Sequence, residues 1–388
     1  MTNISISPTE VSVQKIFAAI ELSHSKWVVA IHLLGSDKTS LFELPGGDVT
    51  RLIGLLERAR QTLCASAVVE IHTCYEAGYE GFWLHRKLMA NGIQNQILDS
   101  ASIQVSRRKR KVKTDRVDAE GLLRVLMAWH RGERRVCGIV QVPTPEQEDL
   151  KRLHRSRVTL LRERVRHVNR IKGLLNLQGI RDVNVLQKDW FARLKVTDTR
   201  DGRSFPKRLL AEIKRESKIL AVVLDLIEEV TDEVEALSRP RPVKQPRKSR
   251  RYEEHPIATQ LAKITGIGPT FAAVFATEVF YRKFRNRREL ASYLGLTPTP
   301  HASGDTSRDQ GISKAGNPIA RYHAVELAWL WIQNQPNSLL TKWFEGRVAG
   351  AKGRVRRIAI VALARKLMVA LWRYLEIGLI PDGVTVKG

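Results

Sequence analysis

The chain has 388 residues, of which 43% are hydrophobic, and this length indicates two or three domains, each with apolar material for a core. Its net charge of +25 is of the kind usually tolerated when the partner is a polyanion, so nucleic acid is the first candidate partner. Three cysteines without CxxC spacing (Cys64, Cys74 and Cys137) exclude a disulfide framework and a zinc knuckle, and no apolar run reaches the roughly 18 residues of a membrane span, so we expect a cytoplasmic protein.

The first part of the chain, up to Pro143, predicts alternating strands and helices. Residues 16–34 form two β-rich runs around a turn, which indicates a hairpin with Glu21 at the end of its first strand. Further elements follow as a helix at 51–59, a strand at 67–72, a helix at 81–91 and a strand at 93–99. This alternation predicts an α/β layer with helices packed on a sheet.

A helix that begins within residues 113–119 carries two carboxylates, Asp115 and Asp118, on one face. Such close carboxylates repel each other, and a shared hard cation such as Mg²⁺ relieves the repulsion. The alternative is an ordinary helix start, capped by Thr114 or Asp115, in which Asp118 interacts with the helix dipole. A run of cations directly before the pair favours the metal site, with phosphate nearby. The run consists of Arg107, Arg108, Lys109, Arg110, Lys111 and Lys113.

Two long amphipathic stretches occupy the middle of the chain, at 146–177 and 209–237. Their apolar stripes predict an antiparallel helical hairpin or a coiled-coil arm. Such an arm is either a spacer or an oligomerisation element that also contacts nucleic acid, and the sequence leaves both open. Residues 239–251 combine three prolines with many cations, which indicates a flexible linker that favours polyanions.

The last part of the chain is mostly helical in pattern. Residues 261–279 read as helix, Gly-Ile-Gly turn, helix, and Gly266 and Gly268 either contact a phosphate or merely join the helices. Residues 296–317 are rich in Gly, Ser, Pro and Thr and are predicted as an active-site loop, followed by helices at 318–333 and 353–375. Four tryptophans in or beside these helices are expected in the core: Trp329, Trp331, Trp343 and Trp372.

Three motifs occur in order along the chain: C-Y-E-A-G-Y-E-G-F-W-L at 74–84, K-T-D-R-V-D-A at 113–119, and S-G followed by G-I-S-K-A-G-N within 303–317. With these motifs the chain resembles, over nearly its whole length, the DEDD transposases of the insertion sequence 110 family, mobile-element recombinases guided by a bridge RNA. The resemblance implies a RuvC-like domain of the ribonuclease H fold, a coiled-coil arm, and a mostly helical transposase domain with a helix-hairpin-helix. The corresponding ranges are 1–145, 146–238, a basic linker at 239–254, and 255–388.

The resemblance also implies four acids that bind Mg²⁺. They map to Glu21, Glu76, Asp115 and Asp118. The family usually has aspartate at the position of Glu21, and glutamate reaches one methylene further, so the metal position or the local backbone has to shift. Glu70 and Glu80 are alternatives to Glu76, although Glu70 lies within an apolar strand and Glu80 lacks the matching motif.

The nucleophilic serine of the family maps to Ser303, which is followed by a glycine that lets a phosphate approach closely. Ser307 and Ser313 are alternatives, and Ser313 is also explained as the cap of the helix that follows. Lys314 and Arg321 are either phosphate contacts or solvated cations.

The function implied is a bacterial recombinase that binds a structured bridge RNA and exchanges strands between donor and target DNA through a serine–DNA link. Its site would combine domains of different protomers in a tetramer, a dimer of dimers associated with the nucleoid when it acts. One alternative is a Holliday-junction resolvase that uses the acids and water alone. The other is an inactivated transposase that only binds nucleic acid, in which glutamate in place of aspartate at position 21 would be a sign of lost activity.

Overall fold

The computed structural model describes residues 13–33, 35–63, 68–103, 114–194, 198–238, 255–303 and 306–387. For residues 300–303 and 306–310 it describes the backbone alone. The chain divides into two compact units, Met1–Val142 and Pro143–Gly388. The basic run at 107–113 and the linker at 239–251 lie outside the described residues. Among the helices that are described, none has the length and apolar character needed to cross a membrane.

The first unit is built on a five-stranded mixed sheet in the order β3-β2-β1-β4-β5. β1 (Val13–Leu22), β2 (Lys26–Leu33) and β3 (Thr39–Pro45) are antiparallel neighbours, whereas β4 (Val68–Glu76) runs parallel to β1 and β5 (Gln94–Leu98) parallel to β4. The predicted hairpin and both later strands are therefore confirmed. β3 was not predicted, because its mostly exposed residues carry no alternating apolar pattern. Order and directions are consistent with a ribonuclease H-like fold.

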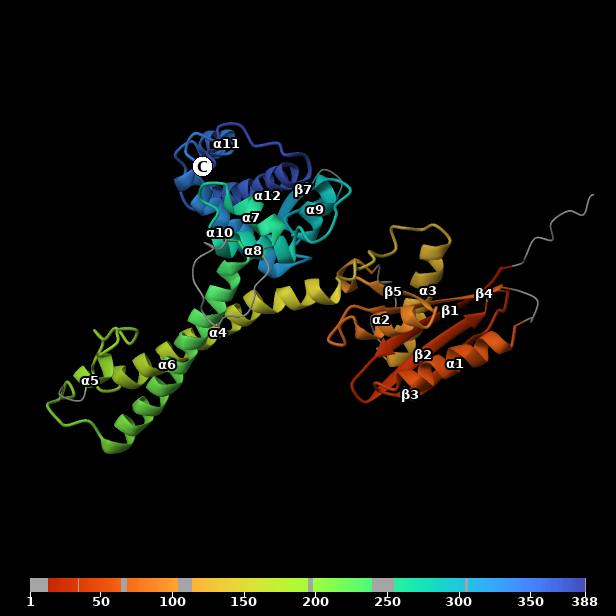
Figure 1. Ribbon diagram of the computed structural model, residues 1–388, viewed down its shortest axis with the longest axis horizontal. Helices are drawn as coiled ribbons and strands as arrows, with labels where there is room; N and C mark the ends of the chain where they lie inside the picture. Colours follow the sequence, from red (N-terminus) through yellow and green to blue (C-terminus); the bar gives the residue numbers. More distant parts are fainter. Residues whose placement is uncertain are drawn as a thin grey trace, which may run out of the picture. The chain divides into compact units, whose positions relative to one another are not determined.

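Helices cover both faces of this sheet (Figure 1). α1 (Val49–Gln61) and α2 (Trp83–Ala90) share a core with Ile16, Ile20 and Tyr75. α3 (Asp115–His130) shares the other core with Phe17 and Cys74. Alternate residues of β1 and β4 thus point to opposite faces, as the period of a strand requires. The α/β layer expected from the sequence is confirmed.

The second unit begins with two long helices, α4 (Pro145–Asn176) and α6 (Lys207–Ala236), which lie side by side (Figure 1). They are antiparallel, because Arg157 contacts Thr231 whereas Arg170 contacts Glu212. The short helix α5 (Trp190–Leu194) packs at one end of the pair in a separate small core. We call residues 145–237 the arm. The predicted helical hairpin is confirmed.

The rest of the second unit is a helical bundle that also contains a β-hairpin. Its helices are α7 (Pro256–Ala262), α8 (Pro269–Glu278), α9 (Arg287–Tyr293), α10 (Pro318–Asn334), α11 (Leu339–Val348) and α12 (Arg354–Ile377). Trp331 is fully buried and the other three tryptophans of the prediction pack against the same core, as expected.

The prediction of a loop at 296–317 is wrong for most of these residues, because they form two strands. β6 (Pro298–Ser303) and β7 (Thr306–Ile312) form an antiparallel hairpin there. Backbone polar groups need partners, and a two-stranded ladder supplies them even where the side chains are small and polar. Composition rich in Gly, Ser, Pro and Thr therefore did not mean irregular structure in this segment.

Candidate active site

Glu21 and Glu76 lie at neighbouring strand ends. The parallel ladder between β1 and β4 pairs Ile20 with Tyr75, and the next residue on each strand is one of the two glutamates. Because side chains alternate along a strand, Glu21 lies on the same face of β1 as Phe17, and Glu76 lies on the same face of β4 as Cys74. Phe17 and Cys74 both face α3. The carboxyl ends of parallel strands meet at one edge of a sheet, so the fold brings these two predicted acids to the same edge and the same face.

α3 begins at that edge with Asp115, and Asp118 belongs to the same first turn. Its first turn is capped by Thr114, whose hydroxyl accepts a hydrogen bond from the backbone N–H of Val117 at 3.3 Å. The capping role is thus filled by Thr114 and not by Asp115. The Asp115 carboxylate instead lies 3.5 Å from Lys26 Nζ, at the start of β2 and next to the end of β1. Glu21, Glu76 and Asp115 therefore lie at one end of the sheet, and Asp118 follows Asp115 in the first turn of α3.

The donor set suits a hard divalent cation, because carboxylate oxygens are the ligands that such ions prefer. Across the described residues, however, no group of three or more His, Cys, Asp or Glu side chains is arranged to hold a metal ion. Lys26, which also lies 3.8 Å from Glu43, holds the Asp115 carboxylate at this edge. The acids fit a metal site by residue type and by their place on the sheet, whereas their side chains do not converge in this arrangement.

Lys26 was not among the predicted site residues. Glu21 and Lys26 flank the predicted hairpin turn, and residues that flank a tight turn lie close together. The sequence could therefore have indicated Lys26 as a neighbour of the site.

The two alternatives to Glu76 have other partners. Glu70 lies 3.1 Å from His72 Nε2 and 3.8 Å from Lys15 Nζ. Glu70 is six positions before Glu76 on β4, a distance of about 20 Å at the rise of a strand. Glu80 accepts a hydrogen bond from the indole N–H of Trp83 at 3.0 Å. Their positions and partners favour Glu76 as the acid at this edge.

The candidate serines lie in the second unit. Ser303 ends β6, where it pairs with Thr306, and Ser307 pairs with Ala302 across the hairpin. The hydroxyl of Ser313 lies after β7 and accepts a hydrogen bond from Thr297 at 3.1 Å. The interpretation of Ser313 as a helix cap is wrong, because a cap residue directly precedes its helix.

Asn317 caps α10 instead and belongs to a tightly packed junction. Its side-chain oxygen accepts hydrogen bonds from the first turn of α10, and its side-chain N–H donates to Glu278 at 2.7 Å. Gly316 has φ +96°, and a Cβ there would lie 2.2 Å from the carbonyl oxygen of Tyr293. The A-G-N part of the last sequence motif therefore has a structural explanation of its own.

Phosphate contact remains a prediction for the four other candidate residues, which are Lys314, Arg321, Gly266 and Gly268. Lys314 is exposed and has a left-handed backbone conformation, with φ 56°. Arg321 donates a hydrogen bond to the carbonyl oxygen of Leu294 at 3.3 Å, so part of its guanidinium already has a partner. Gly266 lies in the turn before α8 and Gly268 directly precedes that helix, which has no side-chain cap.

Comparison with known proteins gives two family matches. Residues 47–179 match the DEDD transposase domain of IS110 elements, and residues 258–341 match the Transposase IS116/IS110/IS902 family. A putative transposase, y4rJ, of Sinorhizobium fredii is 42% identical over 98% of this chain and 97% of its own. The transposase for insertion sequence element IS1111A of Coxiella burnetii is 25% identical, over 89% of this chain and 90% of its own.

Together the fold and these similarities define a transposase, a DNA-processing enzyme. The chain belongs to the IS110 family of transposases, with a DEDD domain in its amino-terminal part and an IS116/IS110/IS902-type domain in its carboxy-terminal part. The resemblance inferred from the sequence motifs is confirmed. A DEDD nuclease domain implies a divalent metal ion, in agreement with the type of donor that gathers at the sheet edge.

Proposed function

We propose that this transposase binds a structured bridge RNA and, with Mg²⁺, exchanges strands between donor and target DNA through a covalent link to Ser303. The observation that carries the proposal is that Glu21 and Glu76 end adjacent strands where Asp115 in the first turn of α3 contacts Lys26, in a chain with full-length similarity to a transposase. The RNA would choose the sites by base pairing, while the protein contacts backbone and shape.

In this proposal Glu21, Glu76, Asp115 and Asp118 hold the metal ion. When bound, Mg²⁺ supplies charge neutralisation and orientation of the scissile phosphate. Lys26 lies beside Asp115 and balances part of its negative charge at this edge.

Ser303 would be the nucleophile. A serine hydroxyl is weak at neutral pH and needs a group that accepts its proton. Its oxygen attacks phosphorus, the bond between phosphorus and the leaving strand breaks, and the proton ends on the oxygen of that strand. A hydroxyl of the second strand then displaces Ser303 in the reverse sense. The place of this serine beside the hairpin turn, followed in sequence by glycine, supports close approach of a phosphate.

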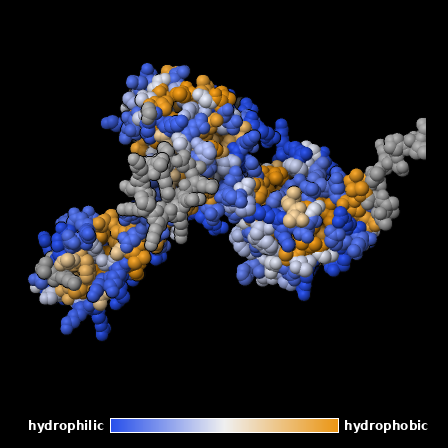
Figure 2. Space-filling model, in the orientation of Figure 1, coloured by the Kyte–Doolittle hydropathy of each residue, from blue (hydrophilic) through white to orange (hydrophobic). Residues whose placement is uncertain are grey.

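A dimer of dimers would unite the acids and the serine, which belong to different units of the chain. Exposed apolar side chains on the arm, at Val165, Ile219, Val222 and Leu226, support its use in oligomerisation, and apolar surface is visible on the arm in Figure 2.

The test combines purified protein, Mg²⁺, RNA transcribed from the non-coding DNA beside the reading frame, and supercoiled donor and target plasmids. We expect a protein–DNA adduct on denaturing gels and joined product DNA. Ser303→Ala should lose both, whereas the matched variant Ser307→Ala should retain both. Cleavage that persists without an adduct would instead support a resolvase that uses water.

The acids are tested in the same assay by the double variant Asp115→Asn/Asp118→Asn. It should abolish cleavage while leaving RNA affinity within about twofold, because an Asp-to-Asn change removes metal ligands without removing cations. Undiminished strand exchange by this variant would refute the metal assignment.

A further inference from the structure

A cavity of about 790 Å³ lies in the bundle of the second unit, and the chemistry proposed above does not use it. Its walls come from α9, α12, the start of β6, the first residues of α11 and the segment 379–382. This volume falls within the range of roughly 300–1,000 Å³ that is typical of small-ligand pockets. The cavity is therefore large enough to hold an organic group and not merely water.

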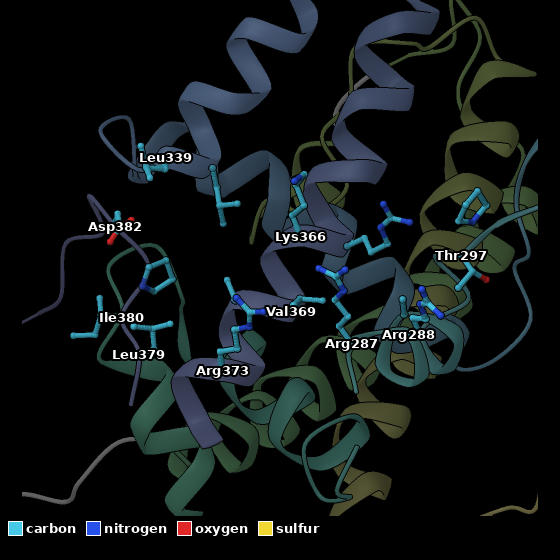
Figure 3. A pocket seen from close by; sticks show the side chains of 16 residues that line it. Arg287, Arg288, Thr297, Leu339, Lys366, Val369, Arg373, Leu379, Ile380 and Asp382 are labelled. Atoms are coloured by element: carbon cyan, nitrogen blue, oxygen red, sulfur yellow. The ribbon is translucent and has the colours of Figure 1, made fainter. Parts of the chain in front are cut away.

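One side of the cavity is strongly cationic. The stripe of α12 that faces it carries Arg365, Lys366 and Arg373, and α9 adds Arg287 and Arg288. Figure 3 labels four of these residues: Lys366, Arg373, Arg287 and Arg288. Acidic partners are absent for all five among the described residues, and the described lining contains a single acid, Asp382. Lys366 Nζ also lies 4.6 Å from the centroid of the Trp343 ring. Cations grouped in this way without acidic partners attract an anion with more than one charge.

The other side is apolar. Leu339, Leu379 and Ile380 are 54%, 52% and 45% exposed (Figure 3). Pro381 also lines the cavity. A backbone hydrogen bond of 3.1 Å from Leu339 N–H to the Asp382 carbonyl ties this segment to α11. Exposed apolar surface is unfavourable by about 25 cal/mol per Å², so a ligand that covers it gains binding free energy.

Two small residues keep the space between the walls open. Ala291 on α9 and Ala370 on α12 both line the cavity, at positions where longer side chains would project into it. The ligand that matches this arrangement carries negative charge at one end and a flat or apolar group at the other.

We propose that the cavity binds an unpaired nucleotide of a DNA strand, with its phosphates against Arg365, Arg373 and Arg287 and its base against the apolar wall. A free phosphate would leave the apolar wall uncovered, and a duplex keeps its bases stacked inside. A second copy of this chain, itself strongly basic, would be repelled by the five cations. DNA is chosen because the chain is a transposase and acts on DNA.

The place of the cavity in the fold agrees with this assignment. Thr297 and Pro298 form part of its wall and lead directly into β6. A strand held in the cavity would thus lie beside the base of the hairpin. The proposal depends on neither the metal site nor the serine, so its test can be made without cleavage.

Binding is measured by fluorescence anisotropy of the full-length protein with EDTA present, using a labelled mixed-sequence oligonucleotide as single strand and as duplex. Arg365→Ala/Arg373→Ala should weaken single-strand binding at least tenfold, because the variant removes two charge-assisted contacts with phosphate, and tenfold corresponds to about 1.4 kcal/mol. The slope of log K against log salt should fall by about 1.4, because each phosphate contact on a single strand contributes about 0.7.

The matched control is Arg354→Ala/Arg357→Ala, which removes two exposed cations from the same helix outside the cavity. A second variant, Ala370→Leu, fills the cavity without changing charge and should weaken single-strand binding alone. Unchanged thermal unfolding midpoints establish that each variant is folded. Equal losses in the control variant, equal losses for duplex, or no effect of Ala370→Leu would overturn the proposal. A larger loss for RNA of the same sequence would overturn the choice of DNA.

Discussion

Glu278, the last residue of α8, makes polar contacts with both α4 and the start of α10. Its fully buried carboxylate accepts hydrogen bonds from His154 and Arg155 on α4, at 2.7 Å each, and from Asn317 at the start of α10. Burial raises the pKa of this carboxyl, but the hydrogen bonds from His154 and Arg155 outweigh burial and lower the pKa to about 2. This one side chain therefore links the arm to the bundle.

Replacement of this residue tests that link. Glu278→Gln should lower the free energy of unfolding by about 3–5 kcal/mol, the usual effect of removing one partner of a buried ion pair. Urea denaturation at pH 7 measures the loss, and Glu376→Gln, on the exposed end of α12, is the control. A loss below about 1 kcal/mol would contradict the role assigned to Glu278.

The same pair of proteins gives a pH prediction. Because the folded pKa of Glu278 is below its ordinary value of 4.5, its stabilisation is complete above that value and disappears as pH falls toward about 2. The difference in unfolding free energy between wild type and Glu278→Gln should therefore shrink between pH 5 and pH 3. A difference that stays constant over this range would show that the charge is not what stabilises the junction.

At the scale of elements, the contact between the end of α9 and the segment before α10 sets the geometry of the hairpin base. Gly316→Ala should destabilise the protein by at least about 2 kcal/mol, because its positive φ and a Cβ 2.2 Å from the Tyr293 carbonyl oxygen act together. Gly350→Ala is the matched control, since φ is +79° and the space around it is open. It should lose only about 1 kcal/mol in thermal or urea unfolding. Equal effects would mean that the close approach is relieved by a small backbone shift.

At the scale of the whole molecule, the net charge of +25 should dominate affinity for nucleic acid. If six or more phosphates are contacted, affinity for duplex DNA should fall roughly 10³-fold between 50 and 200 mM salt. Anisotropy titrations over this range measure the slope, and Asp115→Asn/Asp118→Asn should show the same slope. Affinity that hardly changes with salt would show that the cations are not used for binding.

The sequence by itself predicted most elements and the family, because apolar periodicity, turn residues and ordered motifs are local properties of the chain. Examples are the hairpin with Glu21 near the end of its first strand, the helix capped by Thr114 and the antiparallel pair α4 and α6. It missed β3 and the β6–β7 hairpin, whose strands form through pairing with a partner and not through their own pattern.

Only the tertiary structure decided which distant residues meet. The register that makes Glu21 and Glu76 neighbours, the contact of Lys26 with Asp115, and the burial of Glu278 among side chains from α4 and α10 all depend on packing between segments far apart in sequence. The same holds for the cavity between α9 and α12, whose cations had no special place in any sequence motif. Periodicity determines which face of an element is buried, whereas the partner of that face is chosen by the whole fold.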